Sequence, residues 1–296
     1  MAGVKPVESQ GLPRGQLTMD REYLDHYREH GYAVVPGVFT AAEVGELAAA
    51  FDRVYAQGLA HGASFRHQNL HYRLAQDDNL GQVVRLVQWP AYRDETLARF
   101  RQDPRIFEIL EPLLGRDIKQ IINQLHWKPP GAAMVEFGYH QDVRFRRPRQ
   151  AYRRPRESYV QTGIAIDPHG SENGAMTVFP GSHRLGELSL GHNRRVMDTP
   201  LSDADILGAG LDPGRKVTLD LEPGDLAFWN LFTVHGSGPN GSAGDRRFYL
   251  NGYVRAADCD RGEWAFRDGA PCALGEPRLV HYEALYERPE PHYVED

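Results

Sequence analysis

The chain has 296 residues and a formal net charge of −6, with 41% hydrophobic and 25% charged residues. This composition is typical of a soluble globular protein, and the negative balance argues against a general nucleic-acid binder. No apolar stretch approaches the roughly 20 residues that cross a bilayer. The two cysteines, Cys259 and Cys272, are too few for a disulfide framework. We therefore expect a cytoplasmic protein that binds neither nucleic acid nor membrane.

The N-terminal third shows helical patterns and one short strand. Thr40 with Glu43 makes a capping box, in which each side chain bonds the backbone N–H of the other residue, and apolar residues then recur at helical spacing. Gly31 ends the preceding helical pattern. The predicted elements are a helix over 20–30, a strand over 32–35, a helix from the capping box onward, and a helical region over 94–114 interrupted near Pro104.

From residue 118 the pattern changes to strand-length segments separated by Pro/Gly turns. The predicted strands span 121–127, 159–166, 174–179, 216–221, 225–230 and 248–254. Many short strands after a helical start predict a mainly β fold, a sandwich or jelly roll buttressed by the N-terminal helices. We expect one domain over 1–296, with 1–16 as a mobile arm and 278–296 as a C-terminal extension.

Two separate segments predict a metal site. His140 and Asp142 are two residues apart, and in an extended segment such residues point to the same face. Such a pair also arises by chance, but a second histidine would complete the two-histidine, one-carboxylate set that binds iron(II) and leaves positions open. His235, shortly after a predicted strand, is the candidate. We expect His126 to be a core or hydrogen-bonding residue and His169 to be solvated or structural.

The last predicted strand contains an inward-facing cation. Phe248 and Leu250 belong to its apolar face, and Arg246 continues the same parity, so its guanidinium should point into the interior. A charge in an apolar interior is costly unless it meets an anion, and a guanidinium fork suits a carboxylate. The plainer alternative is an arginine at the mouth of the strand that pairs with Asp245 or with solvent.

Several short motifs occur in an order that a known family shares. They are Lys128-Pro129-Pro130-Gly131, His140-Gln141-Asp142, Pro180-Gly181-Ser182-His183, Pro223-Gly224-Asp225 and His235-Gly236-Ser237-Gly238, together with the 31–38 segment and with Arg246 eleven residues after His235. Over about residues 20–255 the chain thus resembles the phytanoyl-CoA dioxygenase family. The resemblance implies a double-stranded β-helix (a cupin-like jelly roll), an enzyme that uses iron(II), 2-oxoglutarate and O2, and iron ligands at His140, Asp142 and His235.

The same resemblance implies the cosubstrate contacts. Arg246 falls where the family places the arginine that binds the distal carboxylate of 2-oxoglutarate. Ser237 matches a position that can hydrogen-bond that carboxylate, and Gln124 matches one that touches the cosubstrate in several members. Related halogenases have Gly or Ala in place of the carboxylate ligand, so Asp142 favours hydroxylation, desaturation or ring closure. Some members have Trp where this chain has Thr162-Gly163, which alters the expected cosubstrate pocket.

The motifs do not name the substrate. We expect a small organic metabolite that is hydroxylated at an aliphatic C–H, with an anionic compound or an intermediate of secondary metabolism as options. Seven arginines between residues 144 and 156 could form a cationic rim or a solvated loop. Candidate substrate contacts are Arg144, Arg184 and Trp229. The alternative function is a non-redox metal-binding jelly roll, such as a hydrolase, an isomerase or a small-molecule sensor.

Overall fold

The computed structural model describes residues 22–132, 137–190, 202–278 and 292–293. The arm expected over 1–16 and nearly all of the extension over 278–296 lie outside the described residues. The described helices are α1 (Glu22–His30), α2 (Ala41–Ala60), α3 (Glu95–Phe100), α4 (Pro104–Leu114) and α5 (Asp203–Gly208). Within the described ranges, no helix combines the length and the hydrophobicity that crossing a bilayer requires.

Helix α2 begins where the capping box predicts. The Thr40 hydroxyl accepts a hydrogen bond from the Glu43 N–H at 3.3 Å, and the Glu43 carboxylate accepts one from the Thr40 N–H at 2.9 Å. The interruption expected near Pro104 is also present, because Asp94 caps α3 and Asp103 caps α4. Pro104 lies in the first turn of α4, where its missing N–H costs no intrahelical bond.

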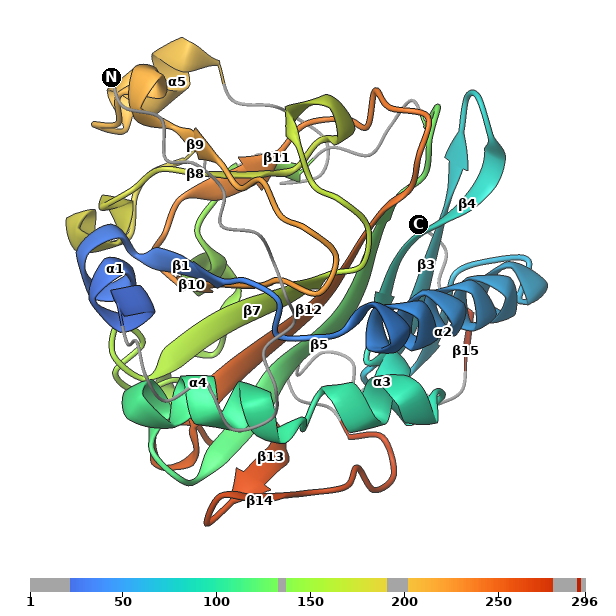
Figure 1. The fold of residues 1–296 in the computed structure, drawn as a ribbon, viewed down its shortest axis with the longest axis horizontal. Helices are drawn as coiled ribbons and strands as arrows, with labels where there is room; N and C mark the ends of the chain where they lie inside the picture. Colours follow the sequence, from blue (N-terminus) through green and yellow to red (C-terminus); the bar gives the residue numbers. More distant parts are fainter. Residues whose placement is uncertain (1–21, 133–136, 191–201, 279–291, 294–296) are drawn as a thin grey trace.

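The strands form two antiparallel sheets (Figure 1). They are β1 (Tyr32–Val35), β2 (Phe65–His67), β3 (Leu70–Asp77), β4 (Gly81–Gln88), β5 (Ile118–Lys128), β6 (Phe137–His140), β7 (Tyr159–Ala165), β8 (Met176–Val178), β9 (Val217–Thr218), β10 (Leu226–Asn230), β11 (His235–Ser237), β12 (Arg246–Arg255), β13 (Glu263–Arg267), β14 (Ala270–Pro271) and β15 (His292–Tyr293). The larger sheet runs β1-β10-β7-β12-β5-β4-β3-β2-β15, and the smaller one β6-β11-β8-β9. This arrangement confirms the predicted jelly roll with N-terminal helices.

Several strand assignments differ from the predicted elements, among them β6, β11, β13 and β14, which were not predicted. The segment between α2 and α3 contains β2, β3 and β4, which sequence analysis left unassigned, and the strand expected over 216–221 is only Val217–Thr218. In β3 apolar and polar residues alternate over 70–74 but not beyond, and in β4 they do not alternate; β4 pairs with β3 and with β5. A period of two is therefore present only in the first part of β3.

Helices α2, α3 and α4 cover the outer face of the larger sheet (Figure 1). In β12, Tyr249 and Tyr253 face the helices and donate hydrogen bonds to the carbonyls of Leu97 and Arg101, at 2.8 and 2.5 Å. Because side chains alternate along a strand, Arg246 and its even-numbered neighbours face the space between the two sheets.

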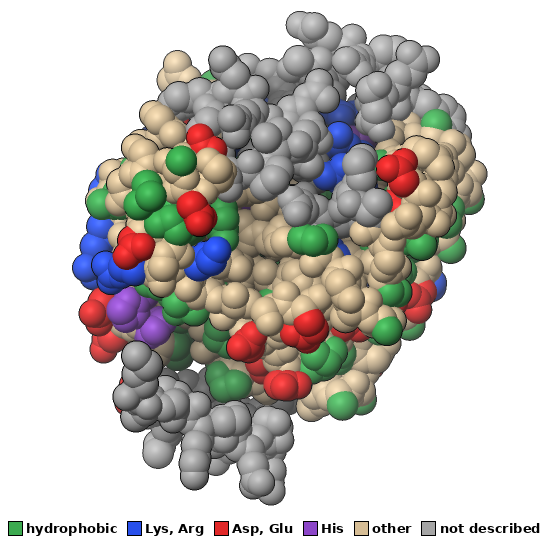
Figure 2. Space-filling view, turned by 90° about the horizontal axis from the view of Figure 1, so that it is seen from above, with side chains coloured by type: hydrophobic (Ala, Val, Ile, Leu, Met, Phe, Trp, Pro, Cys, Tyr) green, Lys and Arg blue, Asp and Glu red, His purple; other side chains and the backbone are tan. Residues whose placement is uncertain are grey.

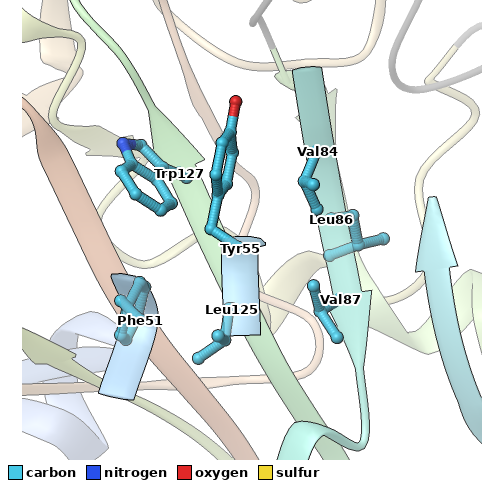
Figure 3. A pocket seen from close by; sticks show the side chains of 7 residues that line it. All are labelled: Phe51, Tyr55, Val84, Leu86, Val87, Leu125 and Trp127. Atoms are coloured by element: carbon cyan, nitrogen blue, oxygen red, sulfur yellow. The ribbon is translucent and has the colours of Figure 1, made fainter. Parts of the chain in front are cut away.

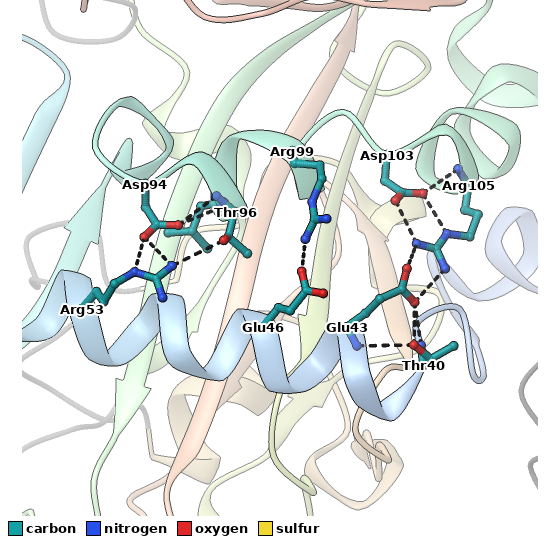
Figure 4. A network of polar contacts seen from close by, with 10 residues as sticks. Thr40, Glu43, Glu46, Arg53, Asp94, Thr96, Arg99, Asp103 and Arg105 are labelled. Atoms are coloured by element: carbon teal, nitrogen blue, oxygen red, sulfur yellow. Dashed lines mark hydrogen bonds and ion pairs between the residues drawn. The ribbon is translucent and has the colours of Figure 1, made fainter.

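Ion pairs join α2 to the segment that contains α3 and α4 (Figure 4). Arg53 pairs with Asp94 at 2.8 Å, and Arg105 pairs with Glu43 at 2.7 Å. The hydrogen bond from Arg105 lowers the pKa of Glu43 to about 2, so this carboxylate both caps α2 and pairs with α4 as an anion. These contacts place the helices on the side of the sheet away from its interior face.

A small apolar pocket lies between α2 and the larger sheet (Figure 3). Its lining residues are Phe51, Tyr55, Val84, Leu86, Val87, Leu125 and Trp127. Leu125 and Trp127 have the opposite parity to Gln124 and His126 of the same strand, so they face the helices. This pocket is therefore a packing space on the helix side of β5.

Candidate metal centre

His140, Asp142 and His235 converge where β6 and β11 meet. The register pairs His140 directly with His235, and their ring centroids are 4.3 Å apart. Asp142 follows in a short 3-10 turn; its Oδ1 lies 3.7 Å from Nε2 of His140, and its Oδ2 lies 3.7 Å from Nε2 of His235. All three residues are buried, and their ligand atoms lie within 4.8 Å of one another. One ion could therefore contact all three side chains.

Both imidazoles turn the same nitrogen toward this point. The Nδ1 of His140 lies 2.8 Å from the carbonyl oxygen of Gly138, and the Nδ1 of His235 lies 3.0 Å from that of Thr233. An Nδ1–H that donates to a carbonyl leaves the Nε2 lone pair free for a metal. Burial, and then the proximity of His140, lowers the pKa of His235 to about 4, so His235 is neutral at pH 7. That is the protonation state that binds a metal.

Trp229 holds the carboxylate of this cluster. Its indole N–H donates to Oδ2 of Asp142 at 3.0 Å, and its side chain is 1% exposed. Burial alone would raise the pKa of Asp142, but His235, His140 and Arg146 together hold it below its ordinary value, so Asp142 is an anion. The indole N–H of Trp229, a candidate substrate contact, thus supports Asp142, and a substrate contact by the Trp229 ring stays a prediction.

Arg246 is a buried cation on the interior face of β12, as its parity predicts. It is 2% exposed; one terminal N–H donates to the carbonyl of Gly174 at 3.1 Å, and its Nε has no hydrogen-bond partner in the described part of the chain. No carboxylate of the described residues lies within ion-pair distance of it, and Asp245, its proposed partner, accepts a bond from Trp127 instead. Burial lowers the pKa of Arg246 to about 10, so it remains charged at pH 7.

Lys128 is a second buried cation beside Arg246. The two residues are paired across β5 and β12. Lys128 Nζ donates to Ser237 Oγ at 2.8 Å and also to the carbonyl of Gly238. Ser237, an expected cosubstrate contact, thus lies at the Arg246 end of the interior and accepts a bond from Lys128. The motif that contains Lys128 does not by itself predict a role for it, although the parity of Lys128 with Gln124 and His126 places it on this face.

Two histidines that sequence analysis set aside line the same interior. His126 stacks on Phe137, and its Nε2 lies 3.1 Å from Oε1 of Gln124, the other expected cosubstrate contact. His169 packs edge-on against Phe248, with ring centroids 4.8 Å apart. Burial, followed by the charge of Arg246, lowers the pKa of both histidines, to about 3 for His126. Both are neutral side chains next to a cationic group.

Gly163, in the Thr162-Gly163 segment of β7, packs against a large aromatic side chain. A Cβ at Gly163 would lie 2.1 Å from Cζ of Phe248. The Phe248 ring therefore fills the space above Gly163.

Two imidazoles and one carboxylate are the donor set of non-haem iron(II) oxygenases, and a buried arginine without a carboxylate partner suits the far end of a diacid. These residues therefore fit iron and 2-oxoglutarate. A family model described as phytanoyl-CoA dioxygenase (PhyH) matches residues 27–248. The chain belongs to the phytanoyl-CoA dioxygenase family. It is an iron- and 2-oxoglutarate-dependent dioxygenase, with O2 as the other cosubstrate.

Similar proteins support the assignment of this chain to the phytanoyl-CoA dioxygenase family. It is 27% identical over 246 residues to a probable alpha-ketoglutarate-dependent hypophosphite dioxygenase of Stutzerimonas stutzeri, covering 80% of this chain and 77% of that protein. It is 26% identical over 256 residues to the peroxisomal phytanoyl-CoA dioxygenase of Bos taurus, covering 83% and 72%. The epimerase SnoN, crystallised with Fe3+, alpha ketoglutarate and nogalamycin RO, has a similar fold: the TM-score is 0.57 at 24% identity, over 88% of this chain and 95% of SnoN.

The arginines expected to contact substrate lie in different places. Arg144 lies over the ring of Phe145, 5.4 Å from its centroid, and Phe145 in turn packs edge-on against His140 at 5.7 Å. Arg144 is thus near the metal-ligand candidates. Arg184 is exposed, with its guanidinium 3.5 Å from the carbonyl of Arg28 at the end of α1, a placement that lends no support to a substrate role.

Several other arginines of the 144–156 segment are paired at the surface. Arg147 and Arg149 both pair with Glu187, and Arg153 pairs with Asp260 at 2.8 Å. Over the coloured part of the face in Figure 2, acidic side chains likewise lie among basic ones. These contacts favour a solvated loop over a cationic rim for the exposed arginines.

Proposed function

We propose that this dioxygenase hydroxylates an aliphatic C–H of a small organic metabolite, with His140, Asp142 and His235 as its iron ligands. The observation that supports this best is the guanidinium of Arg246, buried on the interior face without a carboxylate partner among the described residues. A diacid cosubstrate has one carboxylate for the metal and a second for Arg246. A metal site without 2-oxoglutarate would have no use for this cation, so the non-redox alternative is disfavoured.

The protein's part is to bind, orient and enclose. Bound iron, with 2-oxoglutarate and O2, supplies the oxidising power for hydroxylation of the C–H, while 2-oxoglutarate is converted to succinate and CO2. Backbone carbonyls orient both histidines, and Trp229 orients Asp142. Arg246 would bind the distal carboxylate, with Lys128 and Ser237 beside it.

The carboxylate at Asp142 bears on the reaction type. A full set of three protein ligands favours hydroxylation, or desaturation or ring closure, over transfer of a halide. We keep intermediates of secondary metabolism among the candidate substrates. We also infer a cytoplasmic location, which the free thiols of Cys259 and Cys272 support.

Anaerobic addition of iron(II) and 2-oxoglutarate tests the proposed cofactor site. The protein should develop the weak visible charge-transfer band of the chelate, and Asp142→Asn should remove the band. Asp203→Asn, the same change at an exposed position of α5, is the matched control and should leave the band unchanged. Failure of the wild-type protein to form the band, or an undiminished band in Asp142→Asn, would refute the assignment.

A further inference from the structure

Arg146 is a second buried arginine without an acidic partner among the described residues. It is 2% exposed, its Nε has no hydrogen-bond partner, and its guanidinium bonds no described residue. Arg101, at 0% exposure, shows how a buried arginine is usually satisfied. It donates to the side chain of Gln120 and to the carbonyls of Trp264 and Cys272. Because a buried charge without such partners is costly, Arg146 points to an anion that the described residues do not supply.

Arg146 lies beside the metal-ligand candidates. It directly follows the 3-10 turn that begins with Asp142, so about 8 Å separate the two backbones at the ~2 Å rise of such a turn. Burial raises the pKa of Tyr159 and of Cys259, and the charge of Arg146 opposes both shifts. After the two histidines, Arg146 also helps to hold the pKa of Asp142 low. The guanidinium therefore lies among buried groups near the cluster.

Arg146 and Arg246 lie toward opposite ends of the interior. Arg146 interacts with Tyr159, the first residue of β7. Tyr159 is paired with Val254, which is eight residues along β12 from Arg246. Eight residues of an extended strand span about 27 Å. The end that would hold the distal carboxylate of 2-oxoglutarate is thus well separated from the end that contains Arg146.

A second polar group without a partner lies toward the Arg146 end. Gln161 is 4% exposed and is paired with Trp229 of β10, and its Oε1 has no hydrogen-bond partner within the described ranges. The side chain lies over Gly252, where a Cβ would come within 1.9 Å of Oε1. Glycine at this position therefore provides the room for the amide. A ligand with a hydrogen-bond donor close to its anionic group would complement both residues.

We propose that Arg146 binds the anionic group of the substrate, a carboxylate or a phosphonate, and that Gln161 accepts a hydrogen bond from a neighbouring donor of the same molecule. This inference rests on the proposed function and specifies its substrate class. Arg246 would hold the cosubstrate on one side of the metal ligands and Arg146 the substrate on the other. With two separate guanidinium groups, 2-oxoglutarate and the anionic substrate would not compete for one binding site.

Calorimetric titration at fixed ionic strength tests the anion site. The protein is loaded with zinc and saturated with 2-oxoglutarate, so that no oxidation occurs, and hexanoate, hexylphosphonate and neutral hexan-1-ol are the probes. Wild-type protein should bind the two anions about tenfold or more tightly than the alcohol. Arg146→Met should lose this preference, and Arg146→Lys should retain part of it because it keeps the charge but not the fork. Arg149→Met, which changes a surface arginine paired with Glu187, should behave as wild type.

A wild-type protein that does not prefer the anions, or an Arg146→Met variant that keeps the preference, would overturn the proposal. Should Arg146→Met fail to fold, as judged by its circular dichroism, the comparison is made with Arg146→Lys, which must show weaker anion binding. Binding of 2-oxoglutarate is measured in the same variants and should be unchanged. Absence of the charge-transfer band in the wild-type protein would instead count against the proposed function. Failure of the anion site and failure of the proposed function are therefore distinguishable.

Discussion

The indole of Trp229 bonds Oδ2 of Asp142 at 3.0 Å, and the same oxygen lies 3.7 Å from Nε2 of His235. Trp229 lies in the larger sheet, paired with Tyr32 and Gln161 on its two sides, whereas His235 lies in the smaller sheet. The bond therefore ties the carboxylate to one sheet while the histidines are held by the other. Relative placement of the two sheets sets the geometry of the candidate ligands.

Replacing Trp229 by Phe should weaken metal binding while retaining the fold. Phe keeps an aromatic ring but loses the larger indole with its N–H donor to Asp142, and loss of such a supporting bond typically reduces metal affinity by about 10–100-fold. Titration with cobalt(II), followed by its visible absorption, measures the change. Trp264→Phe, at a partly exposed position of β13, is the control and should leave the affinity unchanged. Equal affinities in wild type and Trp229→Phe would show that the bond does not position the carboxylate.

Replacing Arg246 by Met should weaken 2-oxoglutarate binding by about 30-fold or more, the effect of removing one member of a buried charge pair. Metal affinity should be unchanged, because Arg246 is not among the ligand candidates. Anaerobic titration of the iron(II) protein with 2-oxoglutarate measures the first affinity, and titration of the metal-free protein with cobalt(II) measures the second. Arg247→Met is the matched control, since Arg247 points to the other face and pairs with Asp167. Parallel loss of metal and 2-oxoglutarate would indicate general damage to the fold.

Replacing Gly163 by Ala should lower the free energy of unfolding by about 1–3 kcal/mol, because the added methyl group meets the Phe248 ring. Urea denaturation measures the change. The double variant Gly163→Ala, Phe248→Leu should recover part of the loss, since the smaller side chain leaves space. Gly45→Ala in α2, where a Cβ meets nothing within 4 Å, should be neutral or slightly stabilising. A Gly163→Ala protein as stable as wild type would mean that Phe248 relaxes without cost.

The free energy of unfolding of the metal-free protein should decrease as the pH is lowered, because two of its histidines are buried. Burial lowers the pKa of His126 to about 3 and that of His235 to about 4, from an ordinary value of 6.5. The unfolded chain therefore binds protons that the folded chain does not. The stabilisation is complete above pH 6.5 and is lost as the pH falls toward the folded-state pKa values, by up to about 1.4 kcal/mol per pH unit for each histidine.

Replacing His126 by Gln tests this account. Unfolding by urea at a series of pH values from 9 down to 4 should give a shallower pH dependence for His126→Gln than for wild type. The two proteins should have parallel stability curves above about pH 7.5, where the histidine is almost entirely neutral in both states. Curves that stay parallel throughout would show that His126 takes up a proton equally well in the folded protein.

Short-range patterns were sufficient to predict many of the elements and the inward-facing cation. Strand β1 has the predicted bounds, and α2 follows the capping box at Thr40. Arg246 faces the interior as its parity predicts. These features depend on neighbours two to four residues apart, which is the range over which strand and helix periods act. The spacing of His140 and Asp142 is of the same kind.

Contacts between distant segments were decided by the packing of the two sheets. Trp229 and Asp142 are 87 residues apart, and Lys128 and Ser237 are 109 apart. Separations of this size leave no periodic signal in the chain. Whether a buried polar side chain finds a partner depends on which strand lies opposite, and for this reason Arg146 could be distinguished from its surface neighbours only in the folded molecule.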